Sequence, residues 1–150
     1  KDFWDVKRPQ WLPDYTRETF GVKVGSIDIK IMRTKHIPDS SSDWQSSFWS
    51  CGVIIDDRIF FTSDTRYDSD LIEYYENKFN FEAIFHDCQF FTGGVHASIE
   101  ELNNLPAEIK KKMYLTHYGD NWEELDQKIA EYGFPGRAIQ HVYYSFEKYK

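Results

Sequence analysis

From residue 63 to residue 133 the sequence alternates between short apolar runs and amphipathic helical stretches. This alternation limits the possible folds more strongly than any other pattern in the chain. It predicts short buried strands at 83–85 and 113–115, with helices beginning near Ser69 and Ser98. Strands separated by helices favour a sheet that carries its helices on one side.

Residue types at the expected helix starts support this pattern. Ser98 followed three residues later by Glu101 is a capping box, and Ser69 could cap the helix before it. Asp120 with Glu123 resembles a second box and predicts a later helix.

The chain ahead of this alternation is predicted to be an antiparallel meander over 22–62. Isoleucine alternates with other residues over 27–31, which is typical of a strand with one buried face, and 56–57 is a good hairpin turn. Residues 1–20 lack clear periodicity and are predicted to form an irregular arm. We therefore expect one α/β or α+β domain over 1–150, a meander followed by β-α-β-α-β.

Composition narrows the class of protein. The 150 residues are 41% hydrophobic and 29% charged, which suits one globular domain. No apolar run approaches the roughly 18 residues of a membrane helix, and no signal peptide is visible. The net charge of −7 argues against a nucleic-acid-binding face, and two cysteines fit a reducing compartment, so we expect a cytoplasmic protein.

Three polar clusters follow predicted strands, at 63–65, 86–88 and 116–120. Ligands of open α/β sheets bind at the carboxyl ends of strands, so these clusters are predicted to share one edge. His96, on a glycine-containing loop, could lean over the same edge.

Asp and His at such an edge suit a divalent metal, because carboxylate oxygen and imidazole nitrogen are common ligands of catalytic zinc or manganese. We expect the side chains of Asp64 and His117 to lie on the order of 3–5 Å apart, since ligand bonds are near 2 Å. One or two cations would also reverse the local charge of an acidic chain.

These residues also carry a resemblance to a known family. Asp64, within Phe-Thr-Ser-Asp-Thr, resembles the bridging "G-D-T" aspartate of the metallo-β-lactamase fold, with serine in place of glycine. His117, within Leu-Thr-His, resembles the last metal ligand of that family. His86 and His96 are placed like two histidines of the ribonuclease Z and phosphodiesterase branch, and His36 is placed like its loop histidine.

The resemblance runs from about 22 to 120 and implies the C-terminal half of a metallo-β-lactamase αββα fold. It implies a metal-dependent hydrolase in which a metal-bound hydroxide cleaves a small ester or phosphodiester. The divalent ion would be zinc, with manganese or iron as alternatives, and two ions are usual in the full-length proteins. The roles implied are metal ligands for Asp64 and His117, catalytic residues for His96 and His36, and residues that orient the ligands for His86 and Asp87.

The family's H-x-H-x-D-H motif is missing from this chain, which begins with Lys1 rather than Met. We therefore expect a portion of a longer hydrolase, inactive alone. A half-sheet would expose an apolar face, which predicts a homo-oligomer.

Plainer interpretations stay open. An Asp after a strand is most often a cap or turn residue, and His86 could be purely structural. The alternative function is a non-catalytic scaffold or oligomerisation module.

Overall fold

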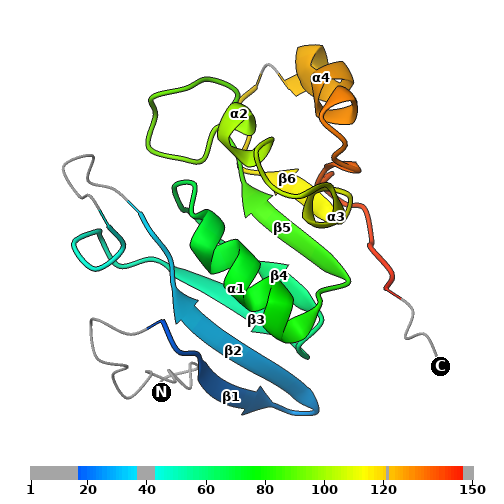
Figure 1. The fold of residues 1–150 in the computed structure, drawn as a ribbon. Coiled ribbons are helices and arrows are strands. Elements are labelled where there is room, and N and C mark those ends of the chain that lie inside the picture. Colours follow the sequence, from blue (N-terminus) through cyan, green and yellow to red (C-terminus); the bar gives the residue numbers. More distant parts are fainter. Residues whose placement is uncertain (1–16, 37–42, 121, 147–150) are drawn as a thin grey trace, which may run out of the picture.

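One mixed sheet of seven strands, in the order β1-β2-β3-β4-β5-β6-β7, organises the fold (Figure 1). The computed structural model describes residues 17–36, 43–120 and 122–146. The strands are β1 (Phe20–Val24), β2 (Ile27–Arg33), β3 (Cys51–Ile55), β4 (Ile59–Phe61), β5 (Ala83–Asp87), β6 (Met113–Thr116) and β7 (Gly136–Arg137). The helices are α1 (Ser69–Phe79), α2 (Ile99–Leu102), α3 (Ala107–Lys110) and α4 (Asp126–Glu131), with a 3-10 helix at η1 (Trp122–Leu125).

The first four strands form the predicted antiparallel meander. Asp56 and Asp57 make the turn between β3 and β4, and both have positive φ, at 51° and 57°, as a tight hairpin turn requires. The meander begins at Phe20 rather than Val22, so the expected arm over 1–20 is shorter than predicted. The rest of that arm, residues 1–16, lies outside the described residues.

The pairing of β4, β5, β6 and β7 is parallel. Paired residues Phe60, Ile84 and Met113 form a buried row across these strands. The core that covers this row includes Leu71, Ile72, Tyr75, Ile99, Leu102, Ile109 and Ile129 from the four helices. All four helices thus pack on one face, as predicted, and α1 lies across the near face of the sheet in Figure 1.

The predicted helix starts are partly right. The Ser98–Glu101 capping box is present, with both reciprocal hydrogen bonds. Helix α1 is capped by Asp68, whose carboxylate accepts from the Leu71 amide at 3.2 Å, and Ser69 is already helical. The second predicted box is wrong: the chain enters α4 through a 3-10 helix, so its first α-helical turn begins too far along the chain for Asp120 to cap it.

Strand β5 is longer than predicted and includes His86 and Asp87. The parallel pairing with β6 continues through both residues, opposite Leu115 and Thr116, because β6 extends equally far. Successive side chains of a strand point to opposite faces. His86 and Asp87 therefore point in opposite directions, which decides their different environments.

The other face of the sheet is partly covered by the C-terminal segment. Tyr144 packs against the rings of Phe85 and Tyr114, at centroid distances of 5.5 and 5.0 Å, and Arg58 donates to the Phe146 carbonyl at 2.6 Å. Among the described residues, no helix combines the length and apolar character needed to cross a membrane.

The two cysteines are free and differ in accessibility. Cys88 has no exposed surface, and burial raises the pKa of its thiol. Cys51, by contrast, is exposed. Loss of some solvent around its sulfur raises the pKa of this thiol, and the charge of Arg33 opposes the shift. Thiol reagents attack the accessible thiolate.

We therefore expect Ellman's reagent to label one thiol in the folded chain and two in denaturant. Cys51→Ser should leave no reactive thiol until the chain unfolds, whereas Cys88→Ser should keep the single native signal. Equal labelling rates for both cysteines in the native state would contradict this expectation.

Candidate functional site

Three strand ends meet at one edge of the sheet. Because β4, β5 and β6 run parallel, the loop that follows β4, the end of β5 and the residue after β6 lie together (Figure 1). Asp64 Oδ1 lies 3.5 Å from His117 Nδ1, within the range expected from the sequence. The prediction that these strand ends share one edge is confirmed.

Asp87, at the end of β5, is the central residue of this group. Its Oδ2 lies 2.6 Å from His96 Nδ1 and accepts from the Thr65 amide at 2.8 Å, while its Oδ1 lies 3.2 Å from His117 Nδ1. The side chain is only 1% exposed. A buried carboxylate is costly unless it is paired and hydrogen-bonded, and these contacts meet that requirement.

The two imidazoles pack closely beside this carboxylate. The rings of His96 and His117 lie 4.4 Å apart at an interplanar angle of 80°. Each ring turns its Nδ1 toward the Asp87 carboxylate. His117 is half exposed, with 49% of its side chain accessible, so the site opens to solvent.

His36 stands next to this group. Its ring centroid lies 6.2 Å from that of His96, and its backbone pairs with Phe48 in an isolated bridge. The Nδ1 atom of His36 is buried and has no hydrogen-bond partner among the described residues.

Strained backbone shapes two of these strand ends. Ser63 and His117 have positive φ, at 55° and 59°, where residues other than glycine are uncommon. Such a conformation costs on the order of 1–3 kcal/mol and persists only where the surroundings enforce it. It turns the chain sharply after β4 and β6, immediately before Asp64 and at His117 itself.

His86 has a different environment. It is buried, and its Nδ1–H donates to the Asp87 carbonyl at 2.6 Å. Burial lowers the pKa of the imidazole, and the hydrogen bond and the charge of Asp87 oppose that shift only in part. His86 therefore contacts the backbone of Asp87, but it does not reach the cluster of side chains at the sheet edge.

One group of side chains among the described residues could hold a metal ion. It consists of Asp87, His96 and His117, whose ligand atoms lie within 4.8 Å of one another. Asp64 adds a fourth oxygen beside His117. Mixed oxygen and nitrogen donors suit zinc, manganese or iron. The resemblance implied only an orienting role for Asp87. The feature that marks Asp87 in the sequence is a carboxylate close behind a buried apolar run.

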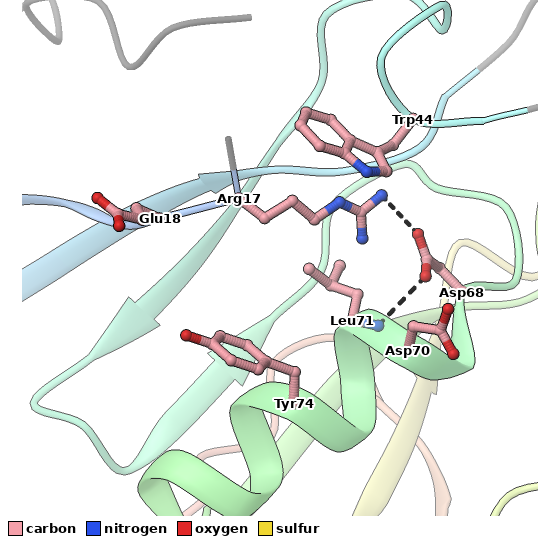
Figure 2. Close-up of a pocket in the computed structure, with 7 residues that line it drawn as sticks. All are labelled: Arg17, Glu18, Trp44, Asp68, Asp70, Leu71 and Tyr74. Carbon is pink, nitrogen blue, oxygen red and sulfur yellow. Dashed lines mark hydrogen bonds and ion pairs between the residues drawn. The ribbon is translucent and has the colours of Figure 1, made fainter. Parts of the chain in front are cut away.

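A separate hollow of about 340 Å³ lies at the start of α1 (Figure 2). Its lining residues are Arg17, Glu18, Trp44, Asp68, Asp70, Leu71 and Tyr74. Arg17 pairs with Asp68 at 2.6 Å and lies 4.7 Å from the centroid of the Trp44 ring. The hollow shares no residue with the cluster at the sheet edge, and two of its charged groups, Arg17 and Asp68, pair with each other.

Comparisons with known proteins identify relatives. The chain is 46% identical over 112 residues to the anti-Pycsar protein Apyc1 of Bacillus phage BSP38, covering 73% of this chain and 40% of that protein. It is 46% identical over 86 residues to the Apyc1 protein of Bacillus phage 010DV004, covering 55% and 32%. For the Apyc1 protein of Paenibacillus harenae the identity is 39% over 99 residues, covering 65% and 37%. The chain thus spans about 40% of the length of the first of these relatives.

These findings replace the assignment made from the short motifs. All three of these relatives are named anti-Pycsar protein Apyc1, and none of the three is named a metallo-β-lactamase or a hydrolase. The predicted metallo-β-lactamase half-fold, the hydrolase activity and the ester or phosphodiester substrate are therefore wrong, and the scaffold alternative fits no better. The physical reason is that short polar motifs follow strands in many sheets, so Ser-Asp-Thr and Thr-His indicate strand ends and not one family.

The family follows from the longest of the matches. The family model described as "Anti-Pycsar protein Apyc1" matches residues 1–143, which is nearly the whole chain. This chain therefore belongs to the anti-Pycsar protein Apyc1 family.

Proposed function

We propose that this chain forms the divalent-metal-binding part of a protein that acts against the Pycsar defence system. The observation that carries the metal site is the convergence of Asp87, His96 and His117, whose ligand atoms lie within 4.8 Å of one another. The family membership and the names of the relatives support the anti-Pycsar role.

The chemistry of the donor set fits a cation. His96 and His117 supply ring nitrogens, and Asp87 and Asp64 supply oxygen atoms beside them. Zinc is the first candidate and manganese or iron the alternatives, and a second ion would need ligands from other parts of the protein. A bound cation would supply positive charge to a chain whose formal net charge is −7, and would so favour an anionic ligand.

The residues of the chain have distinct parts in this proposal. Asp87 contacts Nδ1 of both imidazoles and so fixes the orientation of the two rings. His36, whose buried Nδ1 has no hydrogen-bond partner within the described part of the chain, would contact a ligand next to His96. The free cysteines favour a cytoplasmic location.

Removal of one imidazole tests the metal site. We expect His117→Ala to weaken binding of Zn²⁺ or Mn²⁺ at least tenfold in calorimetric titrations, because the ion loses a nitrogen ligand. His141→Ala removes an exposed histidine outside the site and is the matched control. Absence of metal binding by the unaltered chain, or wild-type affinity in His117→Ala, would overturn the metal site.

The same two variants test the anti-Pycsar role. The full-length protein should abolish Pycsar-dependent protection of bacteria against phage. The His141→Ala variant should do the same, and the His117→Ala variant should not. If the wild-type protein leaves this protection of the bacteria unchanged, the anti-Pycsar role is contradicted. The result of the metal titration would still stand.

A further inference from the structure

The turn that carries Asp64 is held from its backbone side by two hydroxyl groups. The Ser50 hydroxyl donates to the Asp64 carbonyl at 2.8 Å, and the Thr34 hydroxyl contacts the same oxygen at 3.4 Å. Thr34 directly follows β2 and Ser50 directly precedes β3, and the Thr34 amide donates to the Ser50 carbonyl at 2.9 Å. The residues that flank the end of β2 and the start of β3 thus contact the loop that follows β4.

This support matters because the turn is strained. Ser63 has a positive φ of 55°, and such a conformation in a residue other than glycine needs support from its surroundings. On the far side of Asp64, the Thr65 amide donates to the Asp87 carboxylate at 2.8 Å. Asp64 therefore stands between two anchors, one on its own carbonyl and one on the next amide.

The side chain of Asp64 is half exposed, at 50%. Neighbouring side chains enclose it less than they enclose Asp87, so its direction depends on the backbone that carries it. The shorter of the two hydroxyl contacts, from Ser50, is the stronger hydrogen bond.

We propose that Ser50 is a positioning residue for Asp64: its hydrogen bond to the Asp64 carbonyl holds the strained turn so that the carboxylate faces His117. The consequence for metal binding rests on the metal site proposed above, whereas the effect on the position of Asp64 does not. Ser50 itself would not contact the ion.

Three variants separate this role from a general effect of a lost hydroxyl. Ser50→Ala removes the hydrogen bond, and Ser50→Thr keeps a hydroxyl at the same position. Ser46→Ala removes an exposed hydroxyl in the preceding loop, which bonds only locally to Asp43 in the described structure, and is the matched control. Thermal unfolding of each metal-free variant establishes that it is folded.

The first measurement is the amide and imidazole NMR spectrum of the metal-free protein. Ser50→Ala should shift the amide signals of 63–65 and the ring signals of His117, and Ser46→Ala should leave them unchanged. The second is titration with Co²⁺, followed by its visible absorption. Affinity should fall about tenfold in Ser50→Ala and stay near wild type in Ser50→Thr and Ser46→Ala.

The outcomes distinguish the two proposals. Co²⁺ binding by the unaltered chain together with unchanged spectra and affinity in Ser50→Ala would overturn the positioning role and leave the metal site intact. If the unaltered chain binds no Co²⁺, the metal site fails, and the NMR comparison alone decides whether Ser50 positions Asp64. Should Ser50→Ala not fold, Ser50→Cys under reducing conditions replaces it, because a thiol is a weaker donor and should give shifts in the same signals.

Discussion

Replacement of Asp87 by asparagine is expected to lower the free energy of unfolding by about 1.5–3 kcal/mol and to weaken metal binding at least tenfold. The carboxylate accepts from the Thr65 amide and contacts both imidazoles while almost completely buried. An amide has one acceptor oxygen and would turn an NH₂ group toward some of these donors. Urea unfolding and calorimetric titration measure the two effects.

Asp64→Asn is the matched control for this prediction. Its side chain is 50% exposed, so the exchange should reduce metal affinity and leave the free energy of unfolding within about 0.5 kcal/mol of wild type. The contrast separates a buried organising carboxylate from an exposed ligand. Equal stability of Asp87→Asn and Asp64→Asn would show that the buried hydrogen bonds of Asp87 contribute nothing to folding.

Phe60→Ala is expected to produce the largest loss of stability, about 3–5 kcal/mol. The ring is completely buried between sheet and helix, with the Phe81 and Tyr75 rings at centroid distances of 5.2 and 6.1 Å. Its removal leaves a cavity in the row of residues that joins the meander to the parallel strands. Because domains of this size are stable by only about 5–15 kcal/mol, denaturant should unfold this variant at much lower concentration.

The neighbouring residue is a strict control. Phe61 is the same residue type in the same strand, but it points to the opposite face and is 41% exposed. Phe61→Ala should therefore cost clearly less than Phe60→Ala in the same urea titration. Equal losses for the two variants would mean that the helix-covered face is not the main core of the chain.

Much of the architecture followed from local patterns. Alternating isoleucines predicted the meander, the Asp56–Asp57 turn was recognised by its composition, and the Ser98–Glu101 box marked the start of α2. The two-residue strand β7 was not predicted, because Gly136 and Arg137 have no apolar periodicity and pair only through contact with β6.

The family of the chain could not be predicted from the same local patterns. Asp64 and His117 are visible in the sequence as polar residues after apolar runs, and His96 as a histidine on a glycine-containing loop. The same short motifs could not identify the family, since strand ends of many sheets carry such residues. Similarity along most of the chain was needed for that.

Periodicity in the sequence was sufficient to predict most of the order of strands and helices. A strand buries every second residue and a helix every third or fourth, and both patterns are local properties of the sequence. The arrangement at the sheet edge depended on long-range pairing. Asp87 lies at the centre of the site because β5 stays paired with β6 through its last residue, which sends His86 into the core and Asp87 toward the two imidazoles. A shift of one residue in where β5 begins would have exchanged their places, and only the packed sheet decides that register.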